Sequence, residues 1–475
     1  MLNNLSKDEL KSKLMQVSDL FPVIGEVADQ KGYECYVVGG LVRDLILERP
    51  SHDIDVVVVG SGIQMASAFA EALPGKPEVA VFRNFGTARV ESNGQEVEFV
   101  GARKESYDRG SRKPIVEEGT LRDDQLRRDF TINAMAICLN KDRFGELVDP
   151  FNGIKHLQLR SIQCPTNPDI TFSDDPLRML RAVRFASQLA FDVSPMTMKA
   201  IKKNLERLEI ISKERIEVEF MKIMESPNPT YGLELLDETG LLKAIFPEVT
   251  ALKLGNEKGH KDNFDHSLKV FYNVSQRTHN PWLRLAALLH DIGKGPTKAY
   301  EEGKGWTFHN HEYVGSKMIP DMFRRQKFPM DEHMKYVQKL IELHMRPQVI
   351  ANEEVTDSAV RRLLADAGDD IDDLLLLCEC DLTTKNMAKK ERILRNYELV
   401  KEKIIDLKER DFKRLFQPCI DGNEIMEMFG IGSCREVGIL KDYIKDEVLE
   451  GNVENTHEAL EALLRKKAKE IGLLN

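Results

Sequence analysis

Two acidic residues one position apart, Asp53 and Asp55, open the β-rich run DIDVVVV. Side chains alternate between the two faces of a strand, so both carboxylates point the same way while Ile54 points into the core. Like charges this close repel each other unless a cation neutralises them, and a hard divalent metal such as Mg2+ prefers oxygen ligands. The spacing therefore predicts a pair of metal-binding carboxylates.

A glycine pair precedes these acids at a position that favours phosphate binding. Gly39 and Gly40 lie between the run YECYVV and a short helical segment, where missing side chains let backbone N–H groups approach a phosphate. Arg43, one turn into that helix, could contact the same phosphates. An isolated D-x-D is more often a strand-edge turn with solvated acids, but its combination with GG-x-x-R is far less common by chance.

These motifs resemble those of the polymerase β superfamily, specifically the bacterial class II tRNA nucleotidyltransferases, which are the CCA-adding enzymes and their poly(A) polymerase relatives. The resemblance implies that Asp53 and Asp55 hold two Mg2+ ions and that Glu98 assists them, although Glu96 lies on the same strand face. It also implies, through the motif RRDFTINA, that Arg128 contacts the incoming nucleotide. A surface ion-pair cluster at the start of a helix is the alternative. The family signature appears here as Gly39, Gly40, Arg43, Asp44, Asp53 and Asp55.

The segment SDDPLRMLRAVRFA carries acids and arginines at helical spacing. Ser173 is a plausible N-cap of one helix, with two acids near its positive end. In the resembling family the motif is E-D-x-x-R, and it reads the incoming base in place of a template strand; Asp174 stands where the family usually has Glu. C and A both present an amine from which a carboxylate can accept, while an arginine donates to the adjacent ring atom. Asp175 and Arg178 match the acid and arginine of that motif. The candidate nucleotide-binding residues recur every three positions along one side of a helix, where three arginines suit anions or bases: Asp175, Arg178, Arg181 and Arg184.

A second group of possible metal ligands lies in the helical half of the chain. A lone histidine on an apolar helix is usually a packed or solvated residue, but here the His-Asp pair at 290 and 291 ends the apolar helix LRLAALL. This pattern resembles the HD superfamily of metal-dependent phosphohydrolases. The resemblance implies a divalent metal, of unspecified identity, with bound water as the nucleophile. The implied ligands are His266, His290, Asp291 and Asp381, with His311 and His344 as extra histidines of two-metal members and His309 outside the site.

The pattern of the chain changes near residue 160. Before it, β-rich runs alternate with helical segments, and Asn93-Gly94 between two such runs predicts a hairpin. From Pro165 onward apolar residues recur at helical spacing, and the rest of the chain is expected to be almost all α. We therefore predict a multidomain α+β fold: a polymerase β-like α/β head over residues 1–160, an all-α neck that selects the nucleotide and binds RNA over 161–250, an HD domain over 251–385 and a helical tail over 386–475.

Charge and composition limit the possible partners. The segment from Arg178 to Arg215 holds nine basic and four acidic residues, which suits an RNA backbone, although such runs are usually solvated faces. The whole chain of 475 residues has a formal charge of -10 and 42% hydrophobic residues, as ordinary soluble proteins do. Seven scattered cysteines indicate a reducing compartment, and no stretch approaches the ~20 apolar residues of a membrane span, so we expect a cytoplasmic protein.

The sequence best supports addition of C and A to tRNA 3′ ends from CTP and ATP, without a nucleic-acid template. Alternatives with the same chemistry are a poly(A) polymerase or an enzyme that adds only A or only CC. An alternative from another enzyme class is an HD phosphohydrolase whose head is reduced to an RNA-binding module. A further alternative is an RNA-binding protein without enzymatic activity. Retention of Asp53 and Asp55 argues against both. The HD substrate, its metal and the oligomeric state stay open.

Overall fold

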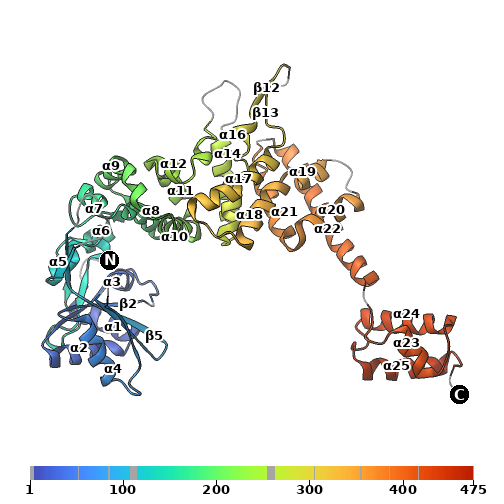
Figure 1. Ribbon diagram of the computed structural model, residues 1–475, viewed down its shortest axis with the longest axis horizontal. Helices are drawn as coiled ribbons and strands as arrows, with labels where there is room; N and C mark the ends of the chain where they lie inside the picture. Colours follow the sequence, from blue (N-terminus) through green and yellow to red (C-terminus); the bar gives the residue numbers. More distant parts are fainter. Residues whose placement is uncertain are drawn as a thin grey trace. The chain divides into compact units, whose positions relative to one another are not determined.

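The computed structural model describes residues 5–51, 53–83, 86–106, 115–253, 263–303, 305–352, 356–384, 386–415 and 417–473. The chain forms two compact units, residues 1–342 and 343–475. Figure 1 shows a sheet with helices at the N-terminal end of the first unit, followed by a long series of helices. The predicted α+β class, with an α/β head before a mostly helical remainder, is confirmed. The domain limits near 160, 250 and 385 stay predictions.

A seven-stranded sheet forms the centre of the head. Its strand order is β3-β4-β5-β2-β1-β8-β9. The central pair β2 and β5 is parallel, and the other neighbouring pairs are antiparallel. The strands are β1 (Glu34–Val38), β2 (Ile54–Val59), β3 (Val79–Phe82), β4 (Thr87–Ser92), β5 (Gln95–Gly101), β8 (Ala136–Cys138) and β9 (Leu147–Val148).

One face of this sheet packs against α2 (Leu20–Lys31) and α4 (Gly62–Ala72). Phe99 of β5 points to that face, and its ring centroid lies 5.3 Å from that of Phe69 in α4. The helix approaches this closely because Gly62 has no side chain: a Cβ there would lie 2.8 to 2.9 Å from backbone atoms of β5. Since side chains alternate along a strand, Asp55 of β2 points to the opposite face.

The predicted hairpin at Asn93-Gly94 is confirmed. The two residues connect β4 and β5 with φ angles of 53° and 73°, the left-handed values that a two-residue type I′ turn requires. The turn fixes a register in which Arg89 lies opposite Glu98. Glu98 in turn lies opposite Asp55 of β2, so the hairpin brings a second carboxylate beside the first.

The neck begins with two helices where the sequence predicted one. α7 (Pro168–Asp174) ends and α8 (Leu177–Leu189) begins on either side of Asp175 and Pro176. The prediction that Ser173 caps a single helix is therefore wrong, because Ser173 lies in the last turn of α7. Proline explains the break, since it has no N–H to donate and disfavours helical backbone in the residue before it.

The remaining helices of the first unit pack around aromatic rings and one buried arginine. The ring of Phe220 in α10 lies 5.2 Å from that of Phe246 and 6.0 Å from that of Phe328. Arg284 is 1% exposed and donates to the carbonyl oxygens of Met224 at 2.6 Å and Thr278 at 3.0 Å, which ties the neck to the next helices. The helices are α9 (Pro195–Lys203), α10 (Lys213–Glu225), α11 (Pro229–Thr239), α14 (Asn263–Ser275), α15 (Pro281–Leu289), α17 (His311–Gln326) and α18 (Glu332–Leu343).

Some strands interrupt the part of the chain that was expected to be almost all α. β12 (Ala299–Glu301) and β13 (Gly305–Thr307) form an antiparallel hairpin. The short run AYEEGKGWT has no clear alternation of apolar and polar residues, which is why its pattern did not predict strands. Earlier in the chain, β6 (Arg103–Ser106) pairs with β7 (Ile115–Glu118) in a separate two-stranded antiparallel sheet.

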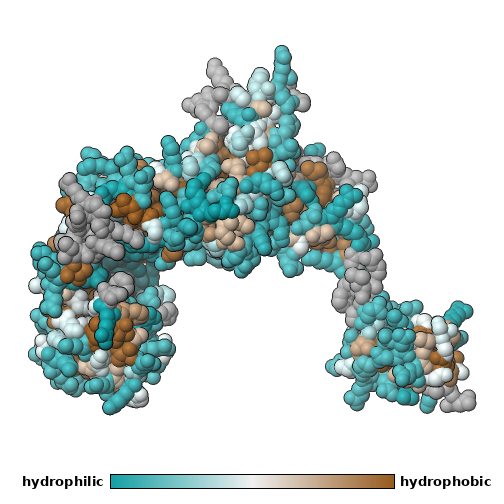
Figure 2. All heavy atoms as spheres, viewed as in Figure 1, coloured by the Kyte–Doolittle hydropathy of each residue, from teal (hydrophilic) through white to brown (hydrophobic). Residues whose placement is uncertain are grey.

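The second unit is helical wherever the structure describes regular elements. A core of residues such as Ile425, Leu440 and Leu464 holds its last three helices together. In the described part of the chain, no helix combines the length and apolar content needed to cross a bilayer, and Figure 2 shows largely hydrophilic side chains over the helices on the displayed face. The helices are α19 (Met345–Asn352), α20 (Asp357–Ala367), α21 (Ile371–Asp381), α22 (Met387–Leu415), α23 (Gly422–Phe429), α24 (Arg435–Leu449) and α25 (His457–Glu470).

Candidate active site

The acidic side of the candidate active site comes from two parallel strands. Asp55, the second residue of β2, lies opposite Glu98 of β5. Asp53 is exposed and directly precedes β2, so the strand begins one residue after the first acid. Of the two glutamates on this face of β5, Glu98 lines the central cavity, whereas Glu96 is exposed and accepts a hydrogen bond from Arg89.

Burial raises the pKa of Asp55 above its usual range. The Arg128 guanidinium opposes this shift, while the carboxylates of Glu98 and Asp53 add to it. Negative charges held this close together are unfavourable until a cation neutralises them, and carboxylate oxygens are the ligands that hard divalent metals prefer. The carboxylates at this end of the sheet therefore fit a divalent metal.

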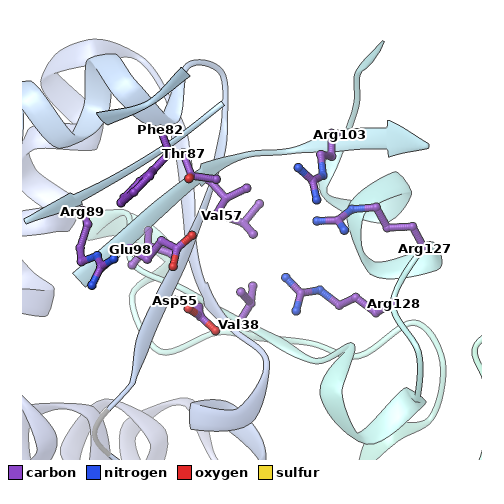
Figure 3. A pocket seen from close by; sticks show the side chains of 12 residues that line it. Val38, Asp55, Val57, Phe82, Thr87, Arg89, Glu98, Arg103, Arg127 and Arg128 are labelled. Atoms are coloured by element: carbon purple, nitrogen blue, oxygen red, sulfur yellow. The ribbon is translucent and has the colours of Figure 1, made fainter. Parts of the chain in front are cut away.

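Three arginines line the other side of the same cavity, which has a volume of about 450 Å³. Figure 3 shows Arg103, Arg127 and Arg128 projecting toward Asp55 and Glu98 from across the opening, and these arginines form the arginine wall. Guanidinium groups bind phosphate oxygens with strong, charge-assisted hydrogen bonds. One cavity thus combines acids that can hold a cation with arginines that can hold a polyphosphate.

A buried carboxylate, Asp124 of α5 (Leu121–Leu126), fixes two members of the arginine wall. One of its oxygens accepts from Arg127 Nε at 2.9 Å, and the other accepts from Arg128 Nε at 3.1 Å and Nη2 at 3.0 Å. Asp124 is 0% exposed, so both guanidinium groups are held from the protein side. Asp124 was not among the predicted site residues, although an acid three and four positions before adjacent arginines is a helical spacing that favours ion pairs.

Gly39 lets the backbone approach both sides of the cavity. Its φ of 76° lies in the region that favours glycine, and a Cβ there would lie 3.4 Å from Arg128 Nη1 and 3.6 Å from Asp55 Oδ2. Gly40 is the first residue of α3 (Gly40–Ile46). Phosphate binding by the two glycines stays a prediction.

Arg43 connects three parts of the head and neck. Its Nε and Nη2 donate to Asp44 at 2.9 and 2.8 Å, and its Nη1 donates to Asn133 at 2.8 Å. Its guanidinium carbon also lies 5.2 Å from the centre of the Phe185 ring in α8. These contacts give Arg43 a structural role, and its predicted contact with phosphate stays a prediction.

Asp175 contacts the start of α8. Its Oδ1 accepts from the backbone N–H of Leu177 at 3.2 Å, and its Oδ2 lies 3.4 Å from Arg215 Nη2. Arg178, in the first turn of α8, donates to the carbonyl oxygen of Arg127 at 2.8 Å. The helix that was expected to select the base is therefore bonded directly to the segment that carries the arginine wall.

Arg181 and Arg184, which their helical spacing placed among the nucleotide-binding residues, form ion pairs with buried carboxylates. Arg184 is 9% exposed, and its Nε donates to Glu219 of α10 at 2.6 Å. Arg181 Nε donates to Asp129 at 2.7 Å. Burial raises the pKa of Asp129, but Arg181 and Arg178 more than offset this and hold it below its usual range. These contacts favour a structural role for both arginines, with Glu219 as a partner that sequence analysis missed.

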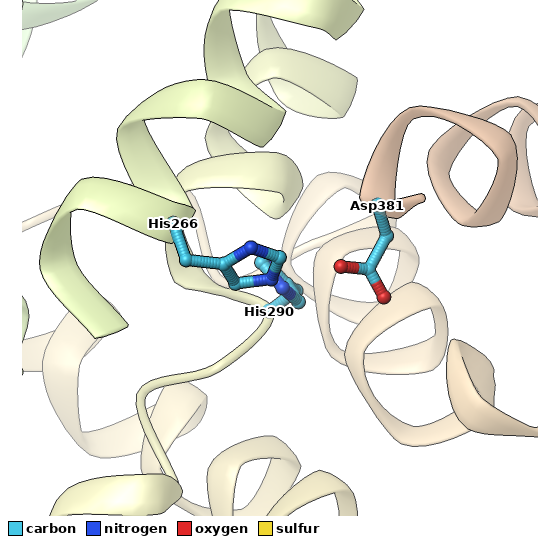
Figure 4. A group of neighbouring side chains, drawn as sticks. All are labelled: His266, His290 and Asp381. Atoms are coloured by element: carbon cyan, nitrogen blue, oxygen red, sulfur yellow. The ribbon is translucent and has the colours of Figure 1, made fainter. Parts of the chain in front are cut away.

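A second cluster in the first unit places three imidazoles around one carboxylate. Asp291 Oδ2 lies 3.2 Å from His290 Nε2 and 3.5 Å from His266 Nε2, and its Oδ1 lies 3.3 Å from His311 Nε2. Figure 4 shows the rings of His266 and His290 beside each other, with centroids 5.4 Å apart. Burial raises the pKa of Asp291, but His290, His311 and Lys294 hold it well below its usual range.

Two of these histidines are held in the orientation that metal binding requires. His290 Nδ1 donates to the carbonyl oxygen of Ala287 at 2.8 Å, and His311 Nδ1 donates to that of Phe308 at 3.0 Å. A carbonyl only accepts, so Nδ1 carries the proton and the Nε2 atom faces Asp291. Imidazole nitrogens beside a carboxylate suit a borderline transition metal or Mg2+, so this donor set fits a divalent ion.

The other predicted ligands of this cluster belong to the second unit. His344 is buried just before α19, and Asp381 is the last residue of α21. Their participation stays a prediction. His309, expected outside the site, is exposed and its Nε2 lies 2.9 Å from Glu301 Oε1.

The fold and these sites define a protein with a nucleotidyltransferase-type head followed by an HD domain. Residues 35–163 match the poly A polymerase head domain, residues 190–253 match the probable RNA and SrmB-binding site of polymerase A, and residues 263–401 match the HD domain. These matches agree with the class that the sequence motifs predicted.

The chain belongs to the tRNA nucleotidyltransferase family that includes the CCA-adding enzymes. A CCA-adding enzyme of Bacillus licheniformis is 34% identical over 296 residues, which cover 61% of this chain and 69% of that enzyme. An A-adding tRNA nucleotidyltransferase of Aquifex aeolicus is 32% identical over 384 residues, which cover 80% of this chain and 43% of that enzyme. A solved tRNA nucleotidyltransferase, complexed with a primer tRNA and an incoming ATP analog, matches with a TM-score of 0.58 and 25% identity, over 81% of this chain and 99% of that one.

The match is partial for several curated relatives. It spans 66%, 43% and 56% of the lengths of the relatives from Anoxybacillus flavithermus, Aquifex aeolicus and Limosilactobacillus reuteri. A third or more of each of these relatives therefore lies outside the match.

The role of Asp124 can be tested with a matched pair of variants. Asp124→Asn keeps the size of the side chain but removes the charge that Arg127 and Arg128 share. We expect it to lower the free energy of unfolding by about 3 to 5 kcal/mol, because two guanidinium groups lose a buried partner, and to weaken ATP binding. Calorimetry and ATP titration measure the two effects.

The neighbouring Asp123→Asn is the control for this experiment. Asp123 is half-buried and forms a capping box with Thr120, so its variant should cost about 1 kcal/mol and leave ATP affinity unchanged. Equal effects of the two substitutions would contradict the proposed role of Asp124.

Proposed function

We propose that the chain is a tRNA nucleotidyltransferase that adds C and A to tRNA 3′ ends from CTP and ATP, without a nucleic-acid template. One observation carries the proposal: Asp55 and Glu98 face the arginine wall across a single cavity. Membership of the family and the solved relative with a primer tRNA and an ATP analog support it. A cytoplasmic location is part of the same proposal.

The proposed reaction is an in-line displacement at phosphorus. The RNA 3′-hydroxyl oxygen forms a bond to the α-phosphorus of the nucleotide, the bond from that phosphorus to pyrophosphate breaks, and the hydroxyl proton leaves to solvent. Divalent metal, Mg2+ in our proposal, would be held by Asp53, Asp55 and Glu98 and would supply activation of the hydroxyl and neutralisation of developing charge. The arginine wall holds the pyrophosphate group as it departs.

Charge-removing variants of the strand acids test this assignment. We expect Asp55→Asn and Glu98→Gln each to lower the rate of nucleotide addition at least ~100-fold, because each removes a negative group that the reaction needs. The thermal stability of metal-free protein should stay the same or rise, since the like charges no longer repel. Incorporation of labelled nucleotide at saturating Mg2+ is the measurement.

Glu96→Gln is the matched control, because Glu96 lies on the same strand face but outside the cavity. The rate of nucleotide addition by this variant should stay within about threefold of that of the unaltered chain. A charge that the reaction needs would instead cost ~100-fold when removed. A loss of activity in Glu96→Gln with normal activity in Glu98→Gln would reverse the assignment of the assisting acid.

Selection of the base is proposed to rest on Asp175 and Arg178. A carboxylate can accept from the amine of C or A, while G and U present a carbonyl at that position. Arg178 is held by its bond to the Arg127 carbonyl, so the selecting helix keeps a fixed distance from the arginine wall. The A-adding relative, which covers more of this chain than the CCA-adding one, makes addition of A alone the second candidate.

Two substitutions at Asp175 separate base selection from helix stability. Asp175→Asn can still accept from the Leu177 N–H but adds a donor group, so kcat/KM for CTP over UTP should fall by roughly 5- to 150-fold at an unchanged melting temperature. Asp175→Ala should lose the selectivity and also about 1 kcal/mol of stability. Kinetics with all four nucleotides beside a thermal melt measure both, and unchanged selectivity in both variants would defeat the claim.

The HD cluster is proposed to bind a divalent metal and to hydrolyse a phosphate ester. His266, His290, Asp291 and His311 supply its ligands in the first unit, with His344 and Asp381 as further predicted ligands. A bound metal would supply a water or hydroxide nucleophile at neutral pH. The alternative from another class, in which the HD cluster is the working site and the head only binds RNA, is opposed by the retention of Asp53 and Asp55 in the sequence.

Histidine variants test the HD proposal. His290→Ala should lower bound metal at least tenfold and remove phosphohydrolase activity, because it deletes an oriented imidazole, while nucleotide addition is spared. His309→Ala, an exposed histidine two positions before His311, is the control and should keep the metal. Elemental analysis of both proteins measures this, and unchanged metal content in His290→Ala would contradict the assignment.

A further inference from the structure

The open face of the head sheet continues beyond the carboxylates to the edge strand. Asp55 lies opposite Glu98, and Glu98 lies opposite Arg89, so the three side chains share one face. Two residues before Arg89, Thr87 lies on the same face and opposite Phe82 of β3. This row leads from the carboxylates to the edge of the sheet, away from the arginine wall, and both Thr87 and Phe82 line the same cavity.

Phe82 offers an exposed aromatic ring at the end of this row. Phe82 is 40% exposed, which makes it the most exposed apolar residue among the described residues that line the cavity. The guanidinium carbon of Arg89 lies 5.4 Å from the centre of its ring. An aromatic ring with an adjacent guanidinium is the combination on which single-stranded nucleic acid bases stack.

The geometry of the reaction decides which substrate occupies this end of the cavity. In an in-line displacement the attacking and leaving oxygens lie on opposite sides of the phosphorus. In the proposed function the arginine wall binds the leaving pyrophosphate, and Asp55 and Glu98 lie between that wall and Phe82. The attacking hydroxyl must therefore come from the side of Phe82, and it belongs to the last nucleotide of the RNA.

We propose that Phe82, flanked by Arg89 and Thr87, forms the subsite for the 3′-terminal nucleotide of the acceptor RNA, whose base stacks on the phenyl ring. The inference rests on the proposed nucleotidyl transfer and names where its second substrate binds. Arg89 shares its charge with Glu96, to which its Nη1 donates at 2.7 Å. The ring rather than the charge is therefore the main source of affinity, and stacking of this kind tolerates any base.

The test combines a change in the protein with a change in the RNA. Phe82→Ala should raise the KM for a tRNA transcript lacking its terminal adenosine by roughly 10-fold, within the 5- to 150-fold that loss of one stacked base implies. KM for ATP and kcat should stay unchanged. Phe82→Trp should restore the KM for RNA, and the effect should persist at high salt because it does not depend on charge.

A transcript whose 3′-terminal nucleotide has no base provides the complementary change. The unaltered chain should bind this RNA about 10-fold more weakly, and Phe82→Ala should show no further loss, because the two changes delete the same contact. The control is Val81→Ala, which alters the adjacent residue of the same strand, 41% exposed, whose side chain points to the other face.

Each result decides something. An unchanged KM for RNA in Phe82→Ala, or losses from the protein and RNA changes that multiply, would overturn the stacking subsite while leaving the proposed function in place. A rise in the KM for ATP instead would place the incoming nucleotide, not the acceptor, on Phe82. Failure of the unaltered chain to add any nucleotide would overturn the proposed function and this inference together.

Discussion

The candidate active site depends on the ion pairs of one buried carboxylate, Asp124. It accepts hydrogen bonds from two consecutive arginines and is itself fully buried, so the positive side of the cavity is fixed before any substrate arrives. Guanidinium groups that are already in place do not have to be reordered when charge develops on a leaving pyrophosphate, which is the main source of electrostatic catalysis. Glu105 supports the same wall, because its Oε1 lies 2.9 Å from Arg103 Nε and 3.1 Å from Arg127 Nη1, so Asp124 matters most for Arg128.

From Arg127 and Arg128, the two arginines that Asp124 holds, a series of polar contacts continues into the neck. The carbonyl oxygen of Arg127 accepts from Arg178, and the next acid along, Asp129, accepts from Arg181. Arg184 lies on α8 with Arg178 and Arg181, and it donates to buried Glu219 of α10. The helix proposed to read the base is thus fixed to the segment proposed to hold the phosphates. An enzyme without a template needs this rigidity, because it can discriminate between bases only if base and reacting phosphorus are held at a constant separation.

Much of this arrangement could be predicted from the sequence, and the failures have physical reasons. The D-x-D pattern predicted the strand face to which its carboxylates point, and Asn93-Gly94 predicted the hairpin. Both predictions rest on local properties: the alternation of side chains along a strand and the backbone angles of a turn. The helix break at Pro176 was missed because Ser173, Asp174 and Asp175 also suit an N-terminus. Asp124 and Glu219 were missed because burial depends on contacts between distant segments, and a single sequence does not record them. For the same reason, the partners of Arg181 and Arg184 could not be read from the sequence.

The most direct test of the account is incorporation of four labelled nucleotides, each offered singly and in combination, into a tRNA transcript that lacks its 3′-terminal CCA. The account predicts that the unaltered chain incorporates C when CTP is offered alone and A only after CTP has been used, that it stops once CCA is complete, and that it incorporates neither G nor U at comparable rates. Incorporation of all four nucleotides at similar rates, or of none while the protein is folded and Mg2+ is present, would contradict it.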